Sequence, residues 1–189
     1  MSRPRPRQRA GQVRIIGGRW RGTRLSVADG EGLRPTPDRV RETLFNWLGP
    51  LVAGARCLDL FAGSGALGFE AVSRGAAGAI LVERDGAAVE RLRQGRERLG
   101  AELEVVHAAA LEWLPTASGP FDIIFLDPPY GGDLLEKSVK LIHQHGLAAP
   151  GGRIYMEDDG PHFVVPGGWS LIRRGTAGQV HFALAAPTA

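Results

Sequence analysis

The chain has 189 residues, of which 43% are hydrophobic, and a formal net charge of +3. This length and composition predict a single domain that buries a sizeable core. No apolar run approaches the roughly 20 residues that cross a bilayer, and no apolar stretch follows the basic start of the chain, so we expect neither a membrane segment nor a secretory signal. Cys57 is the only cysteine, which excludes an internal disulfide and favours a reducing, cytoplasmic location.

Basic residues are concentrated at the N-terminal end of the chain. Residues 1–41 contain eleven Arg and three acidic residues, a local net charge of +8, whereas the remaining 148 residues sum to −5. This asymmetry indicates contact with a polyanion. In residues 1–12 the arginines are interleaved with proline, so a helix is blocked and like charges repel, which predicts a disordered basic tail.

Residues 13–33 are predicted to form a small basic β extension. Apolar Val13 and Ile15 alternate with basic residues, and a Gly-Gly pair supplies a turn. Trp20 either packs with the apolar side chains or remains exposed to stack on a base. The outward face suits an RNA backbone with a stacked base, and its basic residues are Arg14, Arg19, Arg21 and Arg24.

Residues 34–189 are predicted to form one α/β domain. Its first helix is expected to have Thr36 as N-cap and Pro37 at the first helical position, and to stop at Gly49. The predicted strands are 55–60, 79–83, 104–107, 121–126, 153–157, 169–174 and 179–185, and the later predicted helices are 66–73, 86–99, 110–114 and 133–144. Strands that alternate with helices predict a Rossmann-like, doubly wound and largely parallel sheet, with ligands at the carboxyl ends of its strands.

A glycine-rich loop follows the first strand of this domain. Gly63, Gly65 and Gly68 have the spacing GxGxxG, and Glu83 comes 20 residues after the first of them, at the end of the next strand. The first two glycines allow a sharp turn and a close approach of the backbone to a ligand, and the third allows helix and strand to pack closely. An acid at that spacing reaches ribose hydroxyls.

Asp59 decides which cofactor this loop suits. The motif alone fits a nicotinamide dinucleotide or S-adenosylmethionine. An acid four residues before the first glycine is poorly placed for a pyrophosphate, which favours positive surroundings. It is well placed to accept hydrogen bonds from a cationic amino acid moiety, and S-adenosylmethionine carries an ammonium and a sulfonium. The loop therefore predicts a methyl-transfer cofactor site.

A second chemical centre follows the strand 121–126, at the same edge of the sheet. Its residues are Asp127, Pro128, Pro129 and Tyr130. The Asp127 carboxylate and the Pro128 carbonyl offer two acceptors for the hydrogens of an exocyclic amino group, which orients its nitrogen for attack on a methyl group. The two prolines stiffen the loop, and Tyr130 can stack on a base drawn out of its helix.

These blocks resemble the bacterial 16S ribosomal RNA guanine-N2 methyltransferase family over roughly residues 13–185. The glycine loop and the Asp-Pro-Pro-Tyr tetrapeptide are shared with many methyltransferases, whereas the N-terminal blocks are much narrower. The blocks that carry the resemblance are 13–18 (VRIIGG), 34–36 (RPT), 38–46 (DRVRETLFN), 58–68 (LDLFAGSGALG), 73–76 (SRGA), 127–130 (DPPY) and 178–180 (GQV).

The resemblance implies a class I S-adenosylmethionine-dependent methyltransferase with a seven-stranded sheet and an N-terminal β extension that binds RNA. The implied substrate is one guanine, of the position 966 type, in 16S rRNA of an assembling or assembled small subunit. We expect a monomer, and the five histidines lack the spacing of metal ligands. The implied cofactor residues are Arg34, Thr36, Asp59, Phe61, Ala62, Gly63, Ser64, Gly65, Glu83, Arg84, Ala109 and Asp127, and Arg39 joins the RNA-binding residues.

Two features leave alternatives open. Relatives often carry an acid for the adenine amino group where this chain has Ala109; a backbone group or Glu112 then takes its place, or cofactor affinity is lower. The tetrapeptide that ends in Tyr130 is also usual in adenine-N6 enzymes. An adenine-N6 methyltransferase on DNA or RNA is therefore the alternative function.

Overall fold

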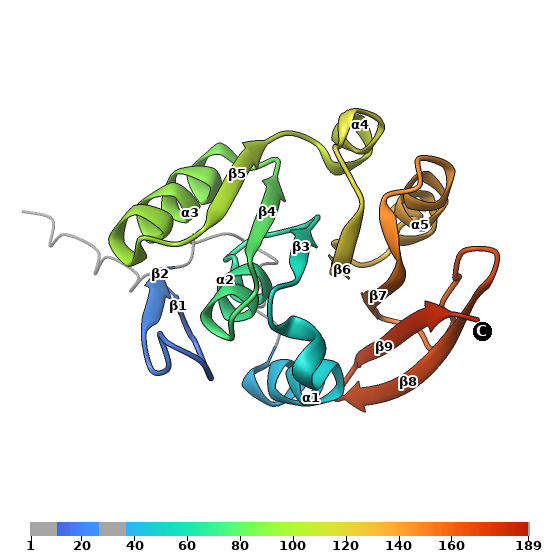
Figure 1. The fold of residues 1–189 in the computed structure, drawn as a ribbon, viewed down its shortest axis with the longest axis horizontal. Coiled ribbons are helices and arrows are strands. Elements are labelled where there is room, and N and C mark those ends of the chain that lie inside the picture. The colour runs from blue at the N-terminus through green and yellow to red at the C-terminus, as the bar shows by residue number, and fades with distance from the viewer. Residues whose placement is uncertain (1–10, 27–36, 189) are drawn as a thin grey trace, which may run out of the picture.

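A seven-stranded sheet forms the centre of the molecule in a computed structural model that describes residues 11–26 and 37–188 (Figure 1). In spatial order its strands are β5 (Leu103–His107), β4 (Gly78–Glu83), β3 (Arg56–Asp59), β6 (Phe121–Leu126), β7 (Ala148–Asp158), β9 (Val180–Pro187) and β8 (Trp169–Ala177). The first five of these run parallel, and β9 pairs antiparallel with both β7 and β8. The predicted Rossmann-like, mostly parallel sheet is confirmed.

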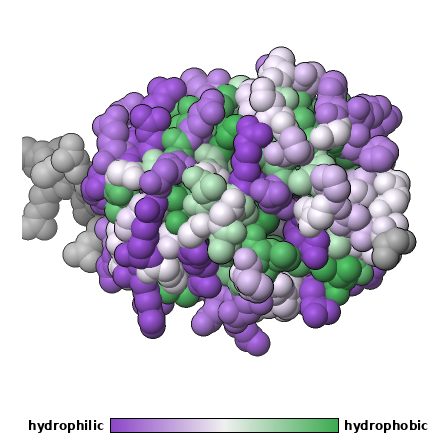
Figure 2. Space-filling view, viewed as in Figure 1, coloured by the Kyte–Doolittle hydropathy of each residue, from purple (hydrophilic) through white to green (hydrophobic). Residues whose placement is uncertain are grey.

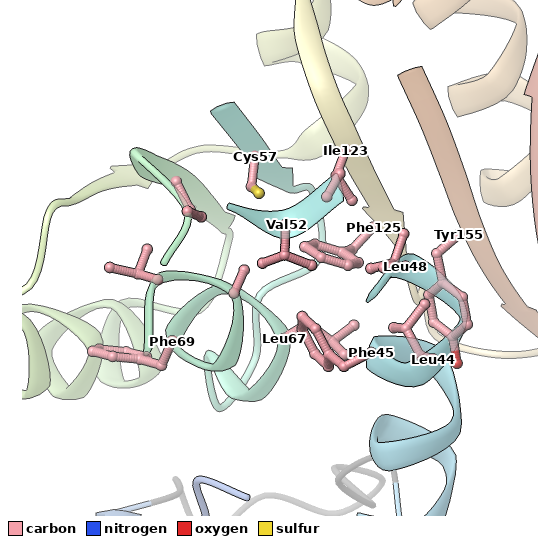
Figure 3. Packing of buried hydrophobic residues seen from close by; sticks show 14 of the residues in the cluster. Leu44, Phe45, Leu48, Val52, Cys57, Leu67, Phe69, Ile123, Phe125 and Tyr155 are labelled. Atoms are coloured by element: carbon pink, nitrogen blue, oxygen red, sulfur yellow. The ribbon is translucent and has the colours of Figure 1, made fainter. Parts of the chain in front are cut away.

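Helices pack on both faces of the sheet and divide the core into two clusters. One face carries α1 (Asp38–Leu48), α2 (Ala66–Ser73) and α3 (Gly86–Leu99), and the other carries α4 (Ala110–Trp113) and α5 (Leu134–Gln144). Figure 3 shows the first cluster, where Phe45 of α1 and Leu67 of α2 lie beneath Phe125 of β6. Cys57 of β3 is fully buried there, as its place in a predicted strand implied.

The chain reverses its direction of travel across the sheet between β3 and β6. From β3 it proceeds through β4 to β5, and it then returns to β6 on the opposite side of β3. Adjacent parallel strands whose connections leave in opposite directions create a crevice at their carboxyl ends, where ligands bind in open α/β sheets. The loops that begin after Asp59 and after Leu126 therefore meet at this point.

A hairpin precedes the domain and differs from the expected one. Strands β1 (Gln12–Arg14) and β2 (Arg24–Ser26) pair antiparallel, but they do not turn directly at the Gly-Gly pair. The connection spans residues 15–23 and is closed by Ile15, whose N–H donates to the carbonyl of Thr23 at 2.9 Å and whose carbonyl accepts from Gly22 N–H at 2.8 Å. The Gly-Gly pair lies inside this connection because it contacts α2.

Helix α2 is buried along its whole length because the hairpin covers the side that faces away from the sheet. The Glu70 carboxylate accepts the backbone N–H groups of Ile16 and Gly17, both at 2.7 Å. Ser73 Oγ donates to the Gly17 carbonyl at 2.6 Å, and Val13 packs on Ala66. The hairpin therefore follows α2 from its first residue to its last.

Close backbone approach explains the Gly-Gly pair. Gly18 has φ +76°, and a Cβ there would lie 1.9 Å from the carbonyl oxygen of Ser73. A Cβ on Gly17 would lie 2.6 Å from the guanidinium of Arg74, whose Nε donates to Glu70 at 2.7 Å. A side chain at position 18 would push the hairpin away from α2, and one at position 17 would displace the Arg74 guanidinium.

Glu70→Gln is expected to lower the free energy of unfolding by about 3 kcal/mol. Glu70 is fully buried, and the glutamine amide would turn a donor toward backbone and guanidinium donors, leaving buried groups without acceptors. Urea unfolding measures the change. The matched control is Glu97→Gln on the exposed side of α3, where we expect less than about 0.5 kcal/mol; equal effects at the two positions would show that Glu70 does not hold the hairpin.

Several element boundaries differ from the predicted ones by one or more residues, among them the starts of α1 and β7. Pro37 is the N-cap of α1 rather than its first helical residue, and it makes no side-chain cap; Thr36 lies outside the described residues. Strand β7 begins at Ala148 rather than residue 153, because Ala148 pairs with Phe121 before the register shifts. Within that irregular stretch, a Cβ on Gly152 would lie 2.9 Å from a backbone oxygen.

Candidate active site

Asp59, the last residue of β3, lies beneath the first turns of α2. Its side chain is only 2% exposed, and its Oδ2 accepts the backbone N–H of Gly68 at 3.0 Å. Burial raises the pKa of Asp59 from 3.8 to about 7; the carboxylates of Asp127 and Glu83 add to the rise, and the hydrogen bond from Gly68 opposes it. One carboxylate oxygen is thus held by the helix, and the group sits among other acids.

The glycine loop has the backbone shape that its sequence suggested. Gly63 has φ +50° and Gly65 has φ +74°, the left-handed region that favours glycine. A Cβ on Gly65 would lie 2.6 Å from Leu92, and one on Gly68 would lie 2.6 Å from Leu81. The loop thus leaves its backbone bare, and α2 packs directly against β4. Of the remaining loop residues, Phe61 and Ser64 are half-buried and Ala62 is buried.

Glu83 stands beside the glycine loop, at the end of β4. Its Oε2 accepts the backbone N–H of Gly63 at 2.8 Å, and its Oε1 accepts that of Asp85, also at 2.8 Å. The carboxylate therefore lies next to the glycine loop and ties that loop to β4. Arg84, the next residue, is exposed.

Ala109 lies at the N-terminus of α4, after β5. It is half-buried, and its carbonyl accepts the N–H groups of Glu112 at 3.1 Å and Trp113 at 3.0 Å. That carbonyl is thus committed to the first turn of the helix. Glu112 is exposed in that same turn. Of the two expected substitutes for the missing acid, a backbone group or Glu112, the Glu112 side chain is therefore the one that is open to solvent.

The Asp-Pro-Pro-Tyr loop leaves the neighbouring strand, β6, at the same edge. Pro128 is buried, Pro129 is exposed and Tyr130 is 49% exposed. Partial burial raises the pKa of the Tyr130 hydroxyl, and the nearby charges of Asp127 and Glu157 raise it further. The structure therefore brings Asp127 close to Asp59 on one side and to Tyr130 on the other.

The sequence left open whether Glu157, an acid at this edge of the sheet, is a site residue or part of a polar loop. Glu157, near the end of β7, is 1% exposed, and its Oε1 accepts the hydroxyl hydrogen of Tyr155 at 2.9 Å. Sequence reasoning missed the role of Glu70 as well. In both cases the available signal was a single acid inside an apolar element.

The predicted RNA-binding residues lie on the hairpin side of the molecule, apart from the Asp127 loop. Figure 2 shows many hydrophilic side chains on the side where Figure 1 places the hairpin and α3. Arg19 pairs with Glu102 and lies over the ring of Trp20, 4.2 Å from its centroid. Trp20 is partly buried against the core, so packing accounts for it. The predicted basic residues are all exposed: Arg14, Arg19, Arg21, Arg24 and Arg39.

A shallow hollow at the hairpin collects several of these groups. Its lining comprises Gln12, Arg14, Arg24 and Asp38. Arg14 pairs with Asp38 at 3.3 Å, and Arg24 donates to the Gln12 side chain at 3.2 Å. The expected cofactor residues Arg34 and Thr36 lie outside the described part of the chain.

Fold and site together define a Rossmann-like, S-adenosylmethionine-dependent methyltransferase. Where the chain reverses its direction across the sheet, the ends of β3 and β6 bring together the glycine loop, several acids and the Asp-Pro-Pro-Tyr loop. The chain belongs to the family described as Conserved hypothetical protein 95, whose family model matches residues 13–186. Across the described ranges, each helix is too short or too polar to span a membrane.

Known proteins of similar sequence and structure agree with this class. The chain is 49% identical to the ribosomal RNA small subunit methyltransferase D of Escherichia coli, over 93% of this chain and 90% of that protein. The solved structure of E. coli yhhF has 48% identity and a TM-score of 0.87, covering 95% and 99% of the two chains. A Thermus thermophilus 16S rRNA N2 methyltransferase, solved with AdoMet and guanosine, has 25% identity and a TM-score of 0.69, covering 96% of this chain and 50% of that one.

Proposed function

We propose that this chain transfers a methyl group from S-adenosylmethionine to the exocyclic N2 of one guanine in 16S rRNA, within the small ribosomal subunit or its assembly intermediate. The observation that carries the proposal is the meeting of Asp127 with the glycine loop at the switch point, where charges of Asp127 and Asp59 lie close enough to interact. The E. coli protein that matches 93% of this chain is a ribosomal RNA small subunit methyltransferase. The T. thermophilus structure solved with guanosine is that of an N2 methyltransferase.

The residues at the crevice fit this cofactor. The loop at Gly63 and Gly65 lets a ligand approach the backbone, and Glu83 stands beside it for the ribose hydroxyls. Acids line the base of the site, and burial keeps the pKa of Asp59 high; a cationic ligand relieves their mutual repulsion, and a pyrophosphate would add to it. When bound, S-adenosylmethionine supplies an electrophilic methyl group on its sulfonium.

The exocyclic amino group of the base is a poor nucleophile, so the protein must activate it for attack. The lone pair of an exocyclic amino group is delocalised into the base. The Asp127 carboxylate and the Pro128 carbonyl accept its two hydrogens and favour the more tetrahedral nitrogen that attacks. The nitrogen–carbon bond would form as the methyl carbon–sulfur bond breaks, which leaves S-adenosylhomocysteine, and Asp127 would take the proton that the nitrogen loses. Tyr130, half exposed on the loop, stacks on the base.

The hairpin supplies the RNA contact in this proposal. Because it is fixed along α2 by Glu70 and Ser73, RNA phosphates held by Arg14, Arg21, Arg24 and Arg39 would be positioned relative to the glycine loop at the start of the same helix. Both loops of the active site come from one chain, so a monomer suffices. An rRNA substrate places the reaction in the cytoplasm.

Arg21→Ala is expected to weaken RNA binding several-fold and to reduce the slope of log affinity against log salt by about 1, because one phosphate contact is lost. Cofactor affinity should not change. The matched control is Arg174→Ala on β8, also exposed but at the far edge of the sheet from β5 and β4. Salt titrations of RNA binding measure both variants; a change in cofactor affinity with RNA binding intact would refute the assignment of Arg21 to RNA.

Substrate class is tested by methyl incorporation from labelled S-adenosylmethionine. We expect one methyl group per small-subunit particle that lacks the modification, and none in large-subunit particles or double-stranded DNA. Incorporation into DNA would favour the alternative, an adenine-N6 methyltransferase, because the Asp-Pro-Pro-Tyr loop serves either amino group.

A further inference from the structure

The loop at Asp127 holds an amino group but does not distinguish guanine from adenine. We propose that Glu157 makes this distinction by accepting the N1–H of the target guanine. The inference rests on the proposed function, since it concerns the recognition of the same base. Glu157 thereby becomes a specificity residue of the active site rather than part of the polar loop that follows β7.

Glu157 is placed beside Asp127 by the sheet. In the parallel pairing of β6 with β7, Leu126 is the partner of Met156. Asp127 is the first residue after β6 and Glu157 is the next residue of β7, so their backbones are about one strand spacing, roughly 4.8 Å, apart. Two neighbouring carboxylates can accept two donors from one base edge, such as the N1–H and the amino group of guanine, whose nitrogens are both bonded to C2.

The side chains concerned gather on one face of the sheet. Phe125 and Tyr155 are partners in the same pairing, and their rings are in edge contact with centroids 6.4 Å apart; Figure 3 shows both on the face that carries α1 and α2. Tyr155 lies two residues before Glu157, so the two share a face, as their 2.9 Å hydrogen bond confirms.

The charge of Glu157 reaches the base-stacking residue. Burial raises the pKa of the Tyr130 hydroxyl and that of the Tyr155 hydroxyl, and the charges of Glu157 and Asp127 raise both further. The four side chains therefore form one cluster at the crevice. Glu157 is 1% exposed and oriented by Tyr155, so a base that reaches it meets a fixed acceptor that is already shielded from water.

The chemistry of the two purines then decides specificity. Guanine presents two donors in a row, the N1–H and the 2-amino group. Adenine presents an acceptor at N1 beside its amino group, and a carboxylate facing that acceptor would leave two acceptors opposed without a hydrogen. A charge-assisted hydrogen bond to guanine is thus replaced by repulsion for adenine.

A base analogue isolates the contact. 2-Aminopurine keeps the 2-amino group but has an acceptor at N1. In small-subunit particles reconstituted with guanine or 2-aminopurine at the target position, we expect wild-type kcat/KM to be about 10²-fold lower for 2-aminopurine. In Glu157→Gln the amide N–H can donate to N1 of the analogue, so we expect the ratio to approach 1. A residue that only supports the fold would change both rates together and leave the ratio unchanged.

The matched control is Asp159→Asn, the same charge removal at an exposed residue two positions on, and its ratio should remain about 10². Equal wild-type rates on the two particles overturn the proposal, whatever the stability of the variant. A ratio that stays near 10² in Glu157→Gln also overturns it, because the analogue would then be rejected through O6. Failure of the wild-type enzyme to methylate the guanine particle would instead refute the proposed function.

Discussion

Asp127→Ala is expected to lower kcat for methyl transfer by about 10³-fold while the fold is retained. The carboxylate is one of the two acceptors that orient the amino nitrogen, and it takes the proton released; removal of a group that stabilises developing charge typically costs about 10²–10³-fold. Single-turnover methylation of small-subunit particles at saturating cofactor measures the chemical step, and equilibrium titration measures cofactor binding separately.

Asp127→Asn is the matched control because it preserves the shape of the side chain and one acceptor oxygen. Its amide still holds an amino hydrogen but is a poor proton acceptor, so we expect a loss of about tenfold, well short of that in the alanine variant. An alanine variant that transfers methyl groups as fast as wild type would contradict the assignment of Asp127 to the chemical step.

Asp59→Asn is expected to stabilise the protein at high pH. The pKa of Asp59 rises from 3.8 to about 7 on folding, so between those values the folded state holds a proton that the unfolded state has released. Wild-type stability therefore falls as pH rises through this window. Asparagine does not titrate and can still accept from Gly68. Because each pH unit is worth about 1.4 kcal/mol, its advantage should approach about 4 kcal/mol above pH 7.

Urea unfolding from pH 4 to pH 8 measures this difference. It should be small near pH 4 and grow with pH, whereas Glu104→Gln, which removes an exposed carboxylate from β5, should show no comparable dependence. A pH-independent difference for Asp59→Asn would contradict the buried, charge-crowded setting.

The positions of the chemical groups could largely be predicted from the sequence because they depend on local patterns. Helices α2 and α3 and strand β6 have the predicted bounds, since glycines lie at or near the ends of both helices and prolines lie close to both ends of the largely apolar strand. The GxGxxG spacing alone was enough to predict the loop at Gly63, Gly65 and Gly68. Because the carboxyl ends of parallel strands lie at the same edge of a sheet, the proximity of Asp127 to the glycine loop could also be predicted.

Contacts between distant segments could not be predicted in this way. Glu70 gave no local signal of its partners, because the backbone N–H groups of Ile16 and Gly17 lie more than fifty positions away in the chain. The Gly-Gly pair looked like a hairpin turn, although it serves close contact with α2 instead. The early start of β7 likewise depends on the pairing of Ala148 with Phe121.

The hairpin contact also changes the interpretation of the N-terminal arginines. Sequence alone treated Trp20 as equally suited to packing and to base stacking, and the structure buries part of it against the core, beneath Arg19. The basic surface that remains is fixed to α2 rather than loosely tethered. In the proposed function, RNA binding and cofactor binding would therefore share helix α2, whose first residue, Ala66, follows the glycine loop.

The most direct test of the central claim is nucleoside analysis of small-subunit particles methylated in vitro with labelled S-adenosylmethionine. The methyl group should be recovered as N2-methylguanosine, at one position of 16S rRNA. Recovery as N6-methyladenosine would keep the fold and the cofactor but contradict the assignment of guanine. Absence of any transfer, with cofactor bound and particles unmodified, would contradict the proposed activity itself.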